Sequence, residues 1–461
     1  MGAGCDRERH WQKNVHPHHG CWSDVAGDGS RGLLGAGAGS DRAAEECAFI
    51  SVDDLNDWVG FLAGHPQVVT PGLDALAARS TVFNRAYCAA PVCSPSRAST
   101  LSGLTPQNTG VFFLSQTFAS VNGDKPLVDD MFRAAGYRTA RVGKVDHIGE
   151  LYLAPLPGRP PFNNLDCPEP GSDGAFDWLA VDEPDDQMPD YRYAQGGIDF
   201  LDGHTRDEPF FLSVGFVLPH VGWWAPKRFY DLYPLDTLVI PTPPVDDLDD
   251  LGVAGRAIAH QQEHHACITG QGLWAEAVQA YLASISWIDT QVARLVQHLD
   301  QSRHAEDTLV VLWSDHGFHL GEKFHWHKLA LWERSTRVPV LIREPGQARE
   351  RRVDNIVSLC DLAPTVLDYC GVDPAYAMDG RSLVPLLHGT DVAWEDRVLT
   401  TKDQHNHAIR TPEWRYIRYW NGERELYNEV NDPDEHYNLA GLAEYEALMA
   451  ELDAYMPPPR A

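Results

Sequence analysis

The sequence lacks an excess of basic residues, and this shortage narrows the classes of partner that the protein can bind. It has 37 lysines and arginines against 66 aspartates and glutamates, which gives a formal net charge of −29. Proteins that bind nucleic acids or anionic membranes carry basic surfaces, so the composition argues against both kinds of partner. If the substrate is an anion, its site must be a local concentration of positive charge in a negative protein.

Long apolar runs and regularly spaced cysteines are also missing. No apolar run approaches the roughly 20 residues that a membrane-spanning helix needs. The nine cysteines lie at irregular spacings, which indicates neither a zinc site nor a disulfide framework. With 461 residues, of which 43% are hydrophobic, the chain is expected to fold as one large globular domain with a smaller one.

The first 46 residues lack apolar periodicity and the apolar core of a secretory signal. They are rich in glycine, aspartate, arginine and histidine, and we interpret them as a disordered leader or as the result of a wrongly assigned start. A wrong start could hide an export signal, so the periplasm or the cell exterior stays open beside the cytoplasm. Three histidines in this leader could bind a metal, although we favour the disordered leader: His16, His18 and His19.

One stretch of unusual chemistry organises the rest of the chain, residues 93–103, which read CSPSRASTLSG. Ser94 can cap a helix, the proline after it suits the first turn, and Gly103 can supply the left-handed residue that ends the helix. Cys93 would then lie at the positive end of the helix dipole, one turn from Arg97. A cysteine there is a thiol of lowered pKa, the precursor of another group, or a plain buried thiol.

Paired carboxylates follow the first predicted strand, residues 47–52. Asp53 and Asp54 can converge only where the strand gives way to a loop, because adjacent strand residues point to opposite faces. Two acids there suit a hard divalent cation with oxygen ligands, and the alternative is that one of them caps the following turn.

Three further predicted strands each lead into a short polar segment. In open α/β sheets the functional site lies beyond the carboxyl ends of the strands, so these segments are expected to converge. Taken singly, each has a plainer interpretation as a solvated lysine or as a histidine bonded to backbone. Residues 137–142 lead to Lys144 and His147, residues 209–217 lead to His220, and residues 309–313 lead to Asp315 and His316.

Together these segments resemble the type I sulfatases of the alkaline phosphatase superfamily. Residues 93–103 are similar to the family signature, Cys-x-Pro-Ser-Arg followed by Leu-Ser-Gly, and residues 143–147 to its Gly-Lys-x-x-His element. Residues 315–333 resemble the second signature. The resemblance extends over roughly residues 47–440 and is nearest to the iduronate-2-sulfatase-like members, which carry a histidine, here His316, where many sulfatases carry asparagine.

The resemblance implies an α/β fold of the alkaline phosphatase type. Its core would be a large mixed, mostly parallel β-sheet flanked by helices, with a small C-terminal antiparallel α+β subdomain. We predict a sulfatase catalytic domain over residues 47–390 and the small subdomain over residues 391–461, after the leader of residues 1–46. Apolar residues at steps of three and four also predict a long helix over residues 274–299.

The resemblance also implies a modified nucleophile and a metal. In this family a formylglycine-generating enzyme oxidises the signature cysteine, so Cys93 would become formylglycine, whose hydrated aldehyde attacks sulfur. The imidazole of His316 is a softer ligand than oxygen, which leaves the identity of the single divalent cation open, with Ca²⁺ expected. The implied metal ligands are Asp53, Asp54, Cys93, Asp315 and His316.

Further side chains receive roles from the same resemblance. Arg97, Lys144 and Lys328 would neutralise the charge on the sulfate oxygens. His220 is the candidate acid for the leaving alcohol, and His147 is the candidate base for the step that expels sulfate.

The expected function is therefore the hydrolysis of a sulfate monoester, on a sulfated saccharide or another sulfated small molecule, with release of inorganic sulfate. A first alternative is a phosphoester or phosphonate monoester hydrolase of the same superfamily, which can share the Cys-x-Pro-Ser-Arg motif. A second is a non-catalytic binding protein on a sulfatase fold, which should have lost ligands, whereas every expected position is filled here. A hydrolase using the unmodified Cys93 thiol would have no use for the aspartates.

Two further segments, one with paired tryptophans and one rich in histidine, can each be interpreted in two ways. Trp223 and Trp224 could pack against a sugar ring or simply anchor a loop. Three histidines before the long helix have the spacing of a metal pair but no carboxylate that completes a known motif, and we favour a solvated loop or helix end for them: His260, His264 and His265.

Overall fold

The computed structural model describes residues 46–147, 177–205, 207–260, 264–390 and 392–459. By their contacts, the described residues belong to one compact unit. The predicted leader and its three histidines are therefore outside the described part, apart from residue 46. Within that part, no helix is both long enough and apolar enough to cross a membrane.

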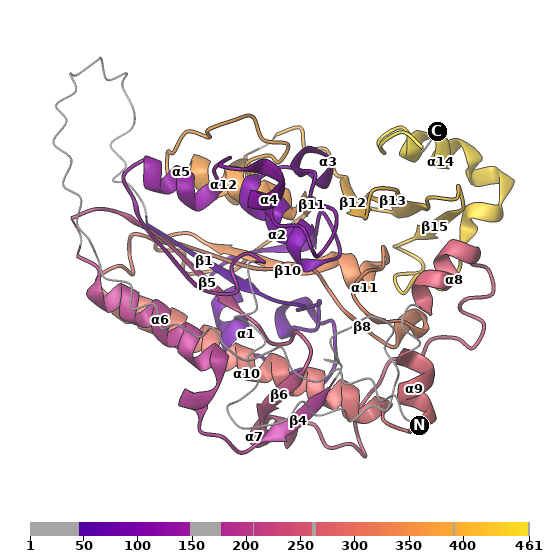
Figure 1. Cartoon of the computed structure of the whole chain (residues 1–461), viewed down its shortest axis with the longest axis horizontal. Helices are drawn as coiled ribbons and strands as arrows, with labels where there is room; N and C mark the ends of the chain where they lie inside the picture. Colours follow the sequence, from indigo (N-terminus) through magenta and orange to yellow (C-terminus); the bar gives the residue numbers. More distant parts are fainter. Residues whose placement is uncertain (1–45, 148–176, 206, 261–263, 391, 460–461) are drawn as a thin grey trace, which may run out of the picture. The chain divides into compact units, whose positions relative to one another are not determined.

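A seven-stranded β-sheet forms the centre of this unit (Figure 1), in the strand order β11 (Arg351–Ser358), β2 (Thr81–Tyr87), β10 (Arg337–Arg343), β7 (Thr308–Ser314), β1 (Glu46–Val52), β5 (Phe210–Phe216), β3 (Arg138–Gly143). β10 runs antiparallel to both of its neighbours, and the other strands run parallel. Every residue of β1, β5 and β7 is buried, because helices cover both faces of the sheet. The predicted mixed, mostly parallel sheet is confirmed.

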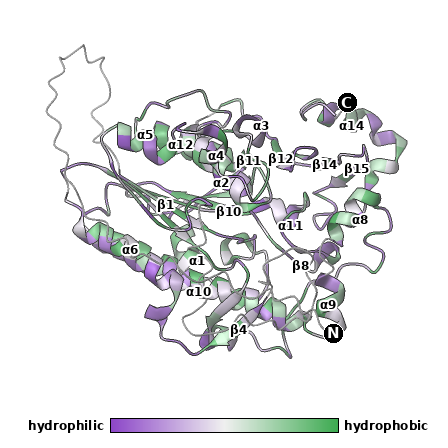
Figure 2. Ribbon diagram, viewed as in Figure 1, coloured by the Kyte–Doolittle hydropathy of each residue, from purple (hydrophilic) through white to green (hydrophobic). Residues whose placement is uncertain are grey.

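Two layers of helices cover the sheet, one on each face (Figure 1). One layer consists of α1 (Pro71–Ala77), α6 (Pro189–Gly203) and α10 (Trp274–Gln301), and the other of α2 (Cys93–Ser102), α5 (Val128–Ala134) and α12 (Leu362–Tyr369). Hydrophobic and hydrophilic residues alternate around α6 and α10, as expected of helices with one side on the core (Figure 2). The predicted long helix is α10, which runs two residues past its predicted end.

A four-stranded antiparallel sheet lies toward the C-terminus, formed in order by β12 (Val398–Lys402), β13 (Asn406–Arg410), β14 (Trp414–Arg418) and β15 (Arg424–Asn428). One of its faces packs against α14 (Glu446–Asp453). The predicted small α+β subdomain is thus confirmed, and Gly422, at φ 83°, makes the predicted turn before β15.

The sequence pattern is wrong about one strand of this sheet. It favours a single strand over residues 407–419, whereas the structure divides that segment into β13 and β14. The Thr411 amide bonds the Trp414 carbonyl across the turn. Pro412 stands inside the turn and has no N–H to continue a ladder, which explains the break.

Shorter elements connect these layers. They are mostly single turns of helix or two- to four-residue strands. Their bounds are α3 (Pro106–Thr109), α4 (Phe118–Asn122), β4 (Trp178–Val181), β6 (Trp223–Pro226), α7 (Lys227–Tyr230), α8 (Val253–Ala259), α9 (His264–Gly270), β8 (His319–Leu320), β9 (Trp326–His327), α11 (Glu333–Thr336) and α13 (Val384–Leu387), with 3₁₀ turns at η1 (Gly60–Leu62), η3 (Asp185–Gln187), η4 (Glu322–Phe324), η5 (Leu359–Asp361), η6 (Leu439–Gly441) and η7 (Ala443–Tyr445).

Candidate active site

Cys93 is the first residue of α2 and is almost fully buried, with 1% of its surface exposed. Gly103 ends this helix in the left-handed conformation, at φ 68°, as predicted. The prediction that Ser94 caps the helix is wrong. Val92 takes the cap position, and the Ser94 hydroxyl donates instead to the carbonyl of Gln116, so it anchors a neighbouring loop.

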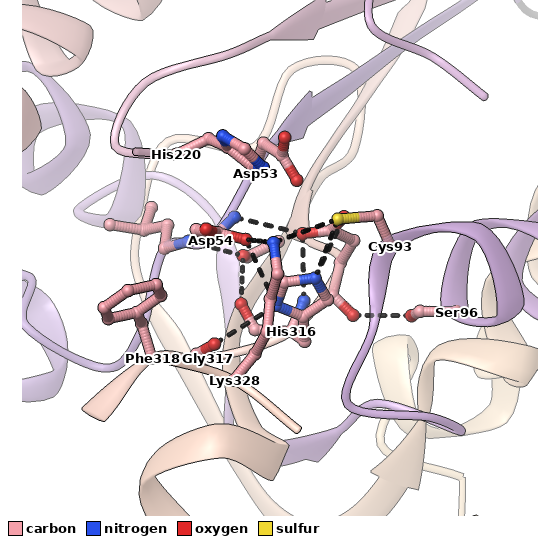
Figure 3. A network of polar contacts seen from close by, with 12 residues as sticks. Asp53, Asp54, Cys93, Ser96, His220, His316, Gly317, Phe318 and Lys328 are labelled. Carbon is pink, nitrogen blue, oxygen red and sulfur yellow. Dashed lines mark hydrogen bonds and ion pairs between the residues drawn. The ribbon is translucent and has the colours of Figure 1, made fainter. Parts of the chain in front are cut away.

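The polar segments that follow the central strands converge on Cys93 (Figure 3). The cause is topological, because the carboxyl ends of parallel strands meet at one edge of the sheet. Figure 3 shows the Cys93 sulfur, the His316 ring and the Asp54 carboxylate turned toward one another. Asp53 and Asp54 follow β1, Lys144 follows β3, His220 follows β5, and Asp315 and His316 follow β7.

Four of these side chains form a compact group of potential metal ligands. One ligand atom from each of Asp53, Asp54, Cys93 and His316 lies within 4.8 Å of all the others, and all four residues are buried. Asp53 Oδ1 and Asp54 Oδ2 accept no hydrogen bond from any described residue. Arg97 Nη2 lies 3.3 Å from Asp53 Oδ1 without a hydrogen bond, and buried carboxylate oxygens that accept no hydrogen bond are costly. A hard divalent cation is the ligand that would satisfy them. The donor set therefore fits a cation.

Asp315 lies beside this group but uses its oxygens differently. Its Oδ1 accepts the backbone amides of Asp54, at 3.1 Å, and His316, at 3.0 Å, and its Oδ2 accepts Arg97 Nε at 2.8 Å. These contacts fix the loop that carries the ligand group. The metal-ligand role of Asp315 stays a prediction.

Two buried lysines neutralise the paired aspartates. Lys144 forms an ion pair with Asp53, and Lys328 Nζ lies 2.7 Å from Asp54 Oδ1 and 3.2 Å from Cys93 Sγ. Although burial alone would raise it, the pKa of Asp53 is held well below its usual value by Lys144 and the other nearby cations. Burial raises the pKa of Asp54, with Asp53 adding to this effect and Lys328 opposing it.

The Cys93 thiol is not activated in this environment. Burial raises the pKa of Cys93 to about 12, and the charge of Asp53 adds to the effect, while Lys144 and Lys328 oppose it. A protonated thiol is a poor nucleophile. This favours Cys93 as a precursor over Cys93 as a thiolate of lowered pKa.

Arg97 lies one turn along α2 and is fully buried. Its guanidinium donates to Asp315 Oδ2 and to the carbonyls of Lys144 and Val145, and it approaches Asp53 Oδ1 to 3.3 Å. It thereby links α2 to the loops that follow β1, β3 and β7. In this structure Arg97 holds the anionic and backbone groups of the site in place.

His147 and His220 both lie near the lysines and carry neutral imidazoles at neutral pH. Burial is the main cause that lowers the pKa of His147 to about 4, and the positive charge of Lys144 is the next. His220 is half-buried, and its pKa lies well below the usual value. Burial is the main cause, and the positive charges of Lys328 and Lys144 add to it. The structure thus brings both predicted acid–base candidates into the field of the site.

Sequence patterns missed the histidines that surround Lys328. His325 Nε2 lies 2.8 Å from the Lys328 carbonyl, and the His327 ring stacks on His264 at 5.5 Å. His264 begins α9, as predicted for a helix end, but it is only 2% exposed, so the prediction of a solvated residue is wrong. The available signal for His325 was its position three residues before Lys328, and such a spacing is too common to single it out.

The structure decides between the two interpretations for one tryptophan of the pair. Trp223 is fully buried and its ring contacts Tyr281 and Phe318, so it anchors the core and cannot pack against a sugar. Trp224 is half-buried beside it.

Comparison with known proteins gives consistent family matches. The sequence profile of the family described as Sulfatase matches residues 48–372, and that of the N-sulphoglucosamine sulphohydrolase C-terminal family matches residues 321–458. A sulfatase of Formosa agariphila is 31% identical over 438 residues, which cover 89% of this chain and 85% of the relative. Human iduronate 2-sulfatase is also 31% identical, over 67% of this chain and 61% of its own length.

Solved structures share the fold at low identity. A phosphonate monoester hydrolase of Agrobacterium radiobacter superposes with a TM-score of 0.72 at 22% identity, over 88% of this chain and 94% of that one. A protein solved in complex with its substrate D-glucosamine-2-N,6-O-disulfate superposes with a TM-score of 0.71 at 22% identity, over 89% and 96%. Fold, motifs and profile agree, and the chain belongs to the sulfatase family of sulfuric ester hydrolases.

Proposed function

We propose that this sulfatase hydrolyses a sulfate monoester on a sulfated saccharide, using a formylglycine made from Cys93 and a divalent cation, Ca²⁺. The observation that carries the proposal is the position of Cys93 at the start of α2, within 4.8 Å of the ligand atoms of Asp53, Asp54 and His316. A formylglycine-generating enzyme is the partner that this maturation requires.

Two absent groups would complete the site. Asp53, Asp54 and His316, with the residue at position 93, would hold the cation, and Asp315 would support them from behind. When bound, the cation stabilises negative charge on oxygen, and the hydrated aldehyde supplies the attacking hydroxyl.

The cationic side chains would bind the sulfate oxygens. Lys328 Nζ lies 3.2 Å from Cys93 Sγ, so its charge is beside the position where the new bond to sulfur would form. Lys144 Nζ lies 3.9 Å from the same sulfur. Both lysines are buried, and preorganised charges in a water-poor site stabilise developing negative charge by several kcal/mol for each well-aimed donor. Arg97 would add its charge from behind while it holds Asp315.

The two histidines would move protons. The neutral ring of His220 stands under the field of Lys144 and Lys328, and a bound sulfate brings negative charge against that field. The pKa of His220 should therefore rise in the complex, so that it can donate to the leaving oxygen. His147 Nδ1 has no hydrogen-bond partner within the described residues and is suited to accept a proton in the step that releases sulfate.

The saccharide part of the proposal is supported by the relatives. Besides iduronate 2-sulfatase, a protein named N-acetylglucosamine-6-O-sulfatase from Bacteroides thetaiotaomicron is 24% identical over 88% of this chain. A second candidate function, phosphonate monoester hydrolysis, is favoured by the shared fold of the Agrobacterium enzyme. Parallel rates on an aryl sulfate and an aryl phosphonate separate the two, because a strong preference for the phosphonate would contradict the sulfatase proposal.

The test of maturation is mass spectrometry of the tryptic peptide 86–97 from protein made in its native host. This peptide contains both Cys88 and Cys93, and only Cys93 stands in the signature. We expect the mass loss of thiol to aldehyde on Cys93, with Cys88 alkylated as an internal control. Two intact, alkylated cysteines in an active preparation would contradict the proposed nucleophile.

A matched pair of variants tests the same point by activity. Cys93→Ala should abolish hydrolysis of an aryl sulfate while it preserves the thermal unfolding curve. Cys88→Ala, an equally buried cysteine on the same segment, should keep most of the activity. Sulfate-ester cleavage by purified Cys93→Ala protein would contradict the proposal.

A further inference from the structure

A cavity of about 260 Å³ lies at the edge of the C-terminal sheet, outside the site around Cys93. It opens between the turn that follows β12, the turn that follows β14, and the segment after α14. Its main lining residues are His405, His407, Arg418, Trp420, Asn421 and Pro458.

The charge of this lining sets it apart from the rest of the protein. No carboxylate lines the cavity, although acids outnumber bases by 66 to 37 in the chain. Two larger cavities among the described residues are each lined by at least four carboxylates. A site that offers imidazoles, an amide and a guanidinium whose charge is already paired with Asp453 suits a neutral ligand rich in hydrogen-bonding groups.

Trp420 stands on the rim with 60% of its surface exposed. Its backbone amide donates to Asn406 Oδ1 at 2.9 Å, which fixes the turn that presents the ring. An indole face next to polar groups is the surface against which the apolar face of a pyranose ring packs, because the ring offers C–H bonds on its faces and hydroxyls at its edge.

The floor of the cavity is built from ordered polar side chains. His407 is 3% exposed, its Nδ1 lies 3.1 Å from Thr401 Oγ1, and its Nε2 makes no hydrogen bond within the described part of the chain. Arg418 is held by Asp453 Oδ1 at 2.6 Å. A ligand that enters the cavity therefore meets a fixed guanidinium and an imidazole nitrogen that is available for a hydrogen bond.

The same end of the sheet adjoins the catalytic segment. The Thr401 amide bonds the Ala89 carbonyl, four residues before Cys93. Lys402, in the next position, is close enough to His325 that its charge lowers the pKa of that ring, with burial as the main cause. His325 in turn bonds the Lys328 carbonyl. The end of β12 therefore lies near the segment that carries Lys328, and the turn that follows it lines the cavity.

We propose that this cavity is a second saccharide-binding site, in which Trp420, His407 and Arg418 hold a sugar unit of the substrate chain other than the one that is desulfated. This inference rests on the proposed function, since it assumes a saccharide substrate with several units. Two linked contacts on one chain raise the effective concentration of the sulfate ester at Cys93 without any change in the chemistry there.

The test compares Trp420→Ala with Tyr437→Ala, which removes an aromatic side chain of similar exposure, 67%, from the same region. Both changes are placed in the Cys93→Ala background, and calorimetry measures the binding of sulfated tetrasaccharides prepared from heparin and from chondroitin sulfate. We expect Trp420→Ala to weaken binding of at least one of them by about tenfold, the upper range for an aromatic contact, and Tyr437→Ala to leave it unchanged. Equal affinities in the two variants would overturn the proposal.

Kinetics on the active enzyme separate this inference from the proposed function. Trp420→Ala should raise KM for a tetrasaccharide substrate, with kcat unchanged, and should leave kcat/KM for a small aryl sulfate within twofold. An equal loss on both substrates would assign Trp420 a structural role and overturn the inference. Absence of all sulfate-ester turnover in the parent protein would instead count against the proposed function, while the calorimetry still decides the binding site.

Discussion

At the scale of single residues, the site around Cys93 is an electrically balanced cluster. Its negative charges are three buried carboxylates, on Asp53, Asp54 and Asp315. Its positive charges are three buried side chains, those of Arg97, Lys144 and Lys328. Such a cluster has no surplus charge with which to attract a sulfate ester, and a divalent cation would give it one. The charge balance is therefore a physical reason for the site to need a metal, beyond the two carboxylate oxygens that accept no hydrogen bond.

A first prediction concerns that metal. Removing it with a chelator should abolish activity and lower the thermal unfolding temperature, and Ca²⁺ should restore both, because a ligand at 100 times its Kd adds about 2.7 kcal/mol of stability. Asp54→Asn should lose the calcium-dependent shift, whereas Asp246→Asn, an exposed aspartate, should keep it. A shift of full size in Asp54→Asn protein, measured by differential scanning fluorimetry, would remove Asp54 from the ligand set.

Sequence patterns correctly indicated which side chains lie together where several chemical groups share one motif. Cys93, Arg97 and the paired aspartates stood in long patterns whose chemistry needs them together. Ser94 failed as a cap because its side chain found a tertiary partner in Gln116, which no local rule reveals. His325 was missed because a lone histidine carries no marker of its neighbours.

At the scale of elements, the segment that carries Lys328 is held in an unfavourable backbone shape. His327 and Leu329, on either side of the lysine, have φ values of 97° and 71°, a region that side chains other than glycine rarely adopt. The surrounding contacts must compensate for this cost. The bond from His325 Nε2 to the Lys328 carbonyl is one of them.

A second prediction tests that bond. His325→Leu should lower kcat for an aryl sulfate by about 5- to 100-fold, since loss of a buried hydrogen bond costs about 1–3 kcal/mol and would let Lys328 move. His325→Gln, which keeps a donor near the same position, should recover most of the activity. Equal kcat values for the two variants, with unfolding temperatures matched, would show that the hydrogen bond does not position Lys328.

A third prediction concerns the contact between α10 and α1. Asp289 on α10 accepts the amides of Gly72, at 3.0 Å, and Leu73, at 2.6 Å, at the start of α1. Burial nevertheless raises the pKa of Asp289 to about 6, from an ordinary value of 3.8. The folded state therefore binds this proton more tightly than the unfolded state, so the Asp289 contribution to stability should fall as pH rises from about 4 to about 6 and stay constant above that.

Urea unfolding over this pH range measures the effect. The free energy of unfolding of the natural protein, minus that of Asp289→Asn, should decrease between about pH 4 and pH 6, because asparagine does not titrate. Parallel stability curves for the two proteins would contradict the raised pKa.

Elements were predictable where one periodicity dominates. The buried strands and the helix α10 follow from continuous apolar runs and from a 3.6-residue stripe. The strand pair around Pro412 was misread because alternation of side chains persists through a short turn.

At the scale of the whole molecule, the C-terminal sheet and the main sheet share buried contacts. Arg415 of β14 is fully buried and pairs with Glu333 of α11 as well as with Glu429 and Glu435. Trp332 Nε1 donates to Glu425 of β15 at 2.8 Å. The boundary predicted at residue 390 is therefore crossed by a buried ionic network, a feature that no composition change along the chain announces.

The last prediction follows from that network. Arg415→Met should lower the free energy of unfolding by about 3–5 kcal/mol, because it leaves the buried Glu435 without its cation, whereas Arg410 still pairs with Glu333 and Glu429. The cost should be smaller near pH 5 than near pH 8, since burial already raises the pKa of Glu435 to about 7 and protonation removes the uncompensated charge. Arg424→Met, which breaks an exposed pair with Glu446, should leave the free energy of unfolding nearly unchanged.

The shape of the unfolding curve then decides how the two sheets are coupled. If the shared network joins them into one cooperative unit, urea unfolding followed by tryptophan fluorescence and by far-ultraviolet circular dichroism should give one coincident transition, and Arg415→Met should shift all of it. Two transitions, of which Arg415→Met moves only one, would mean that residues 391–461 unfold independently. In that case the buried ion pairs would orient two domains and would not bind them into one.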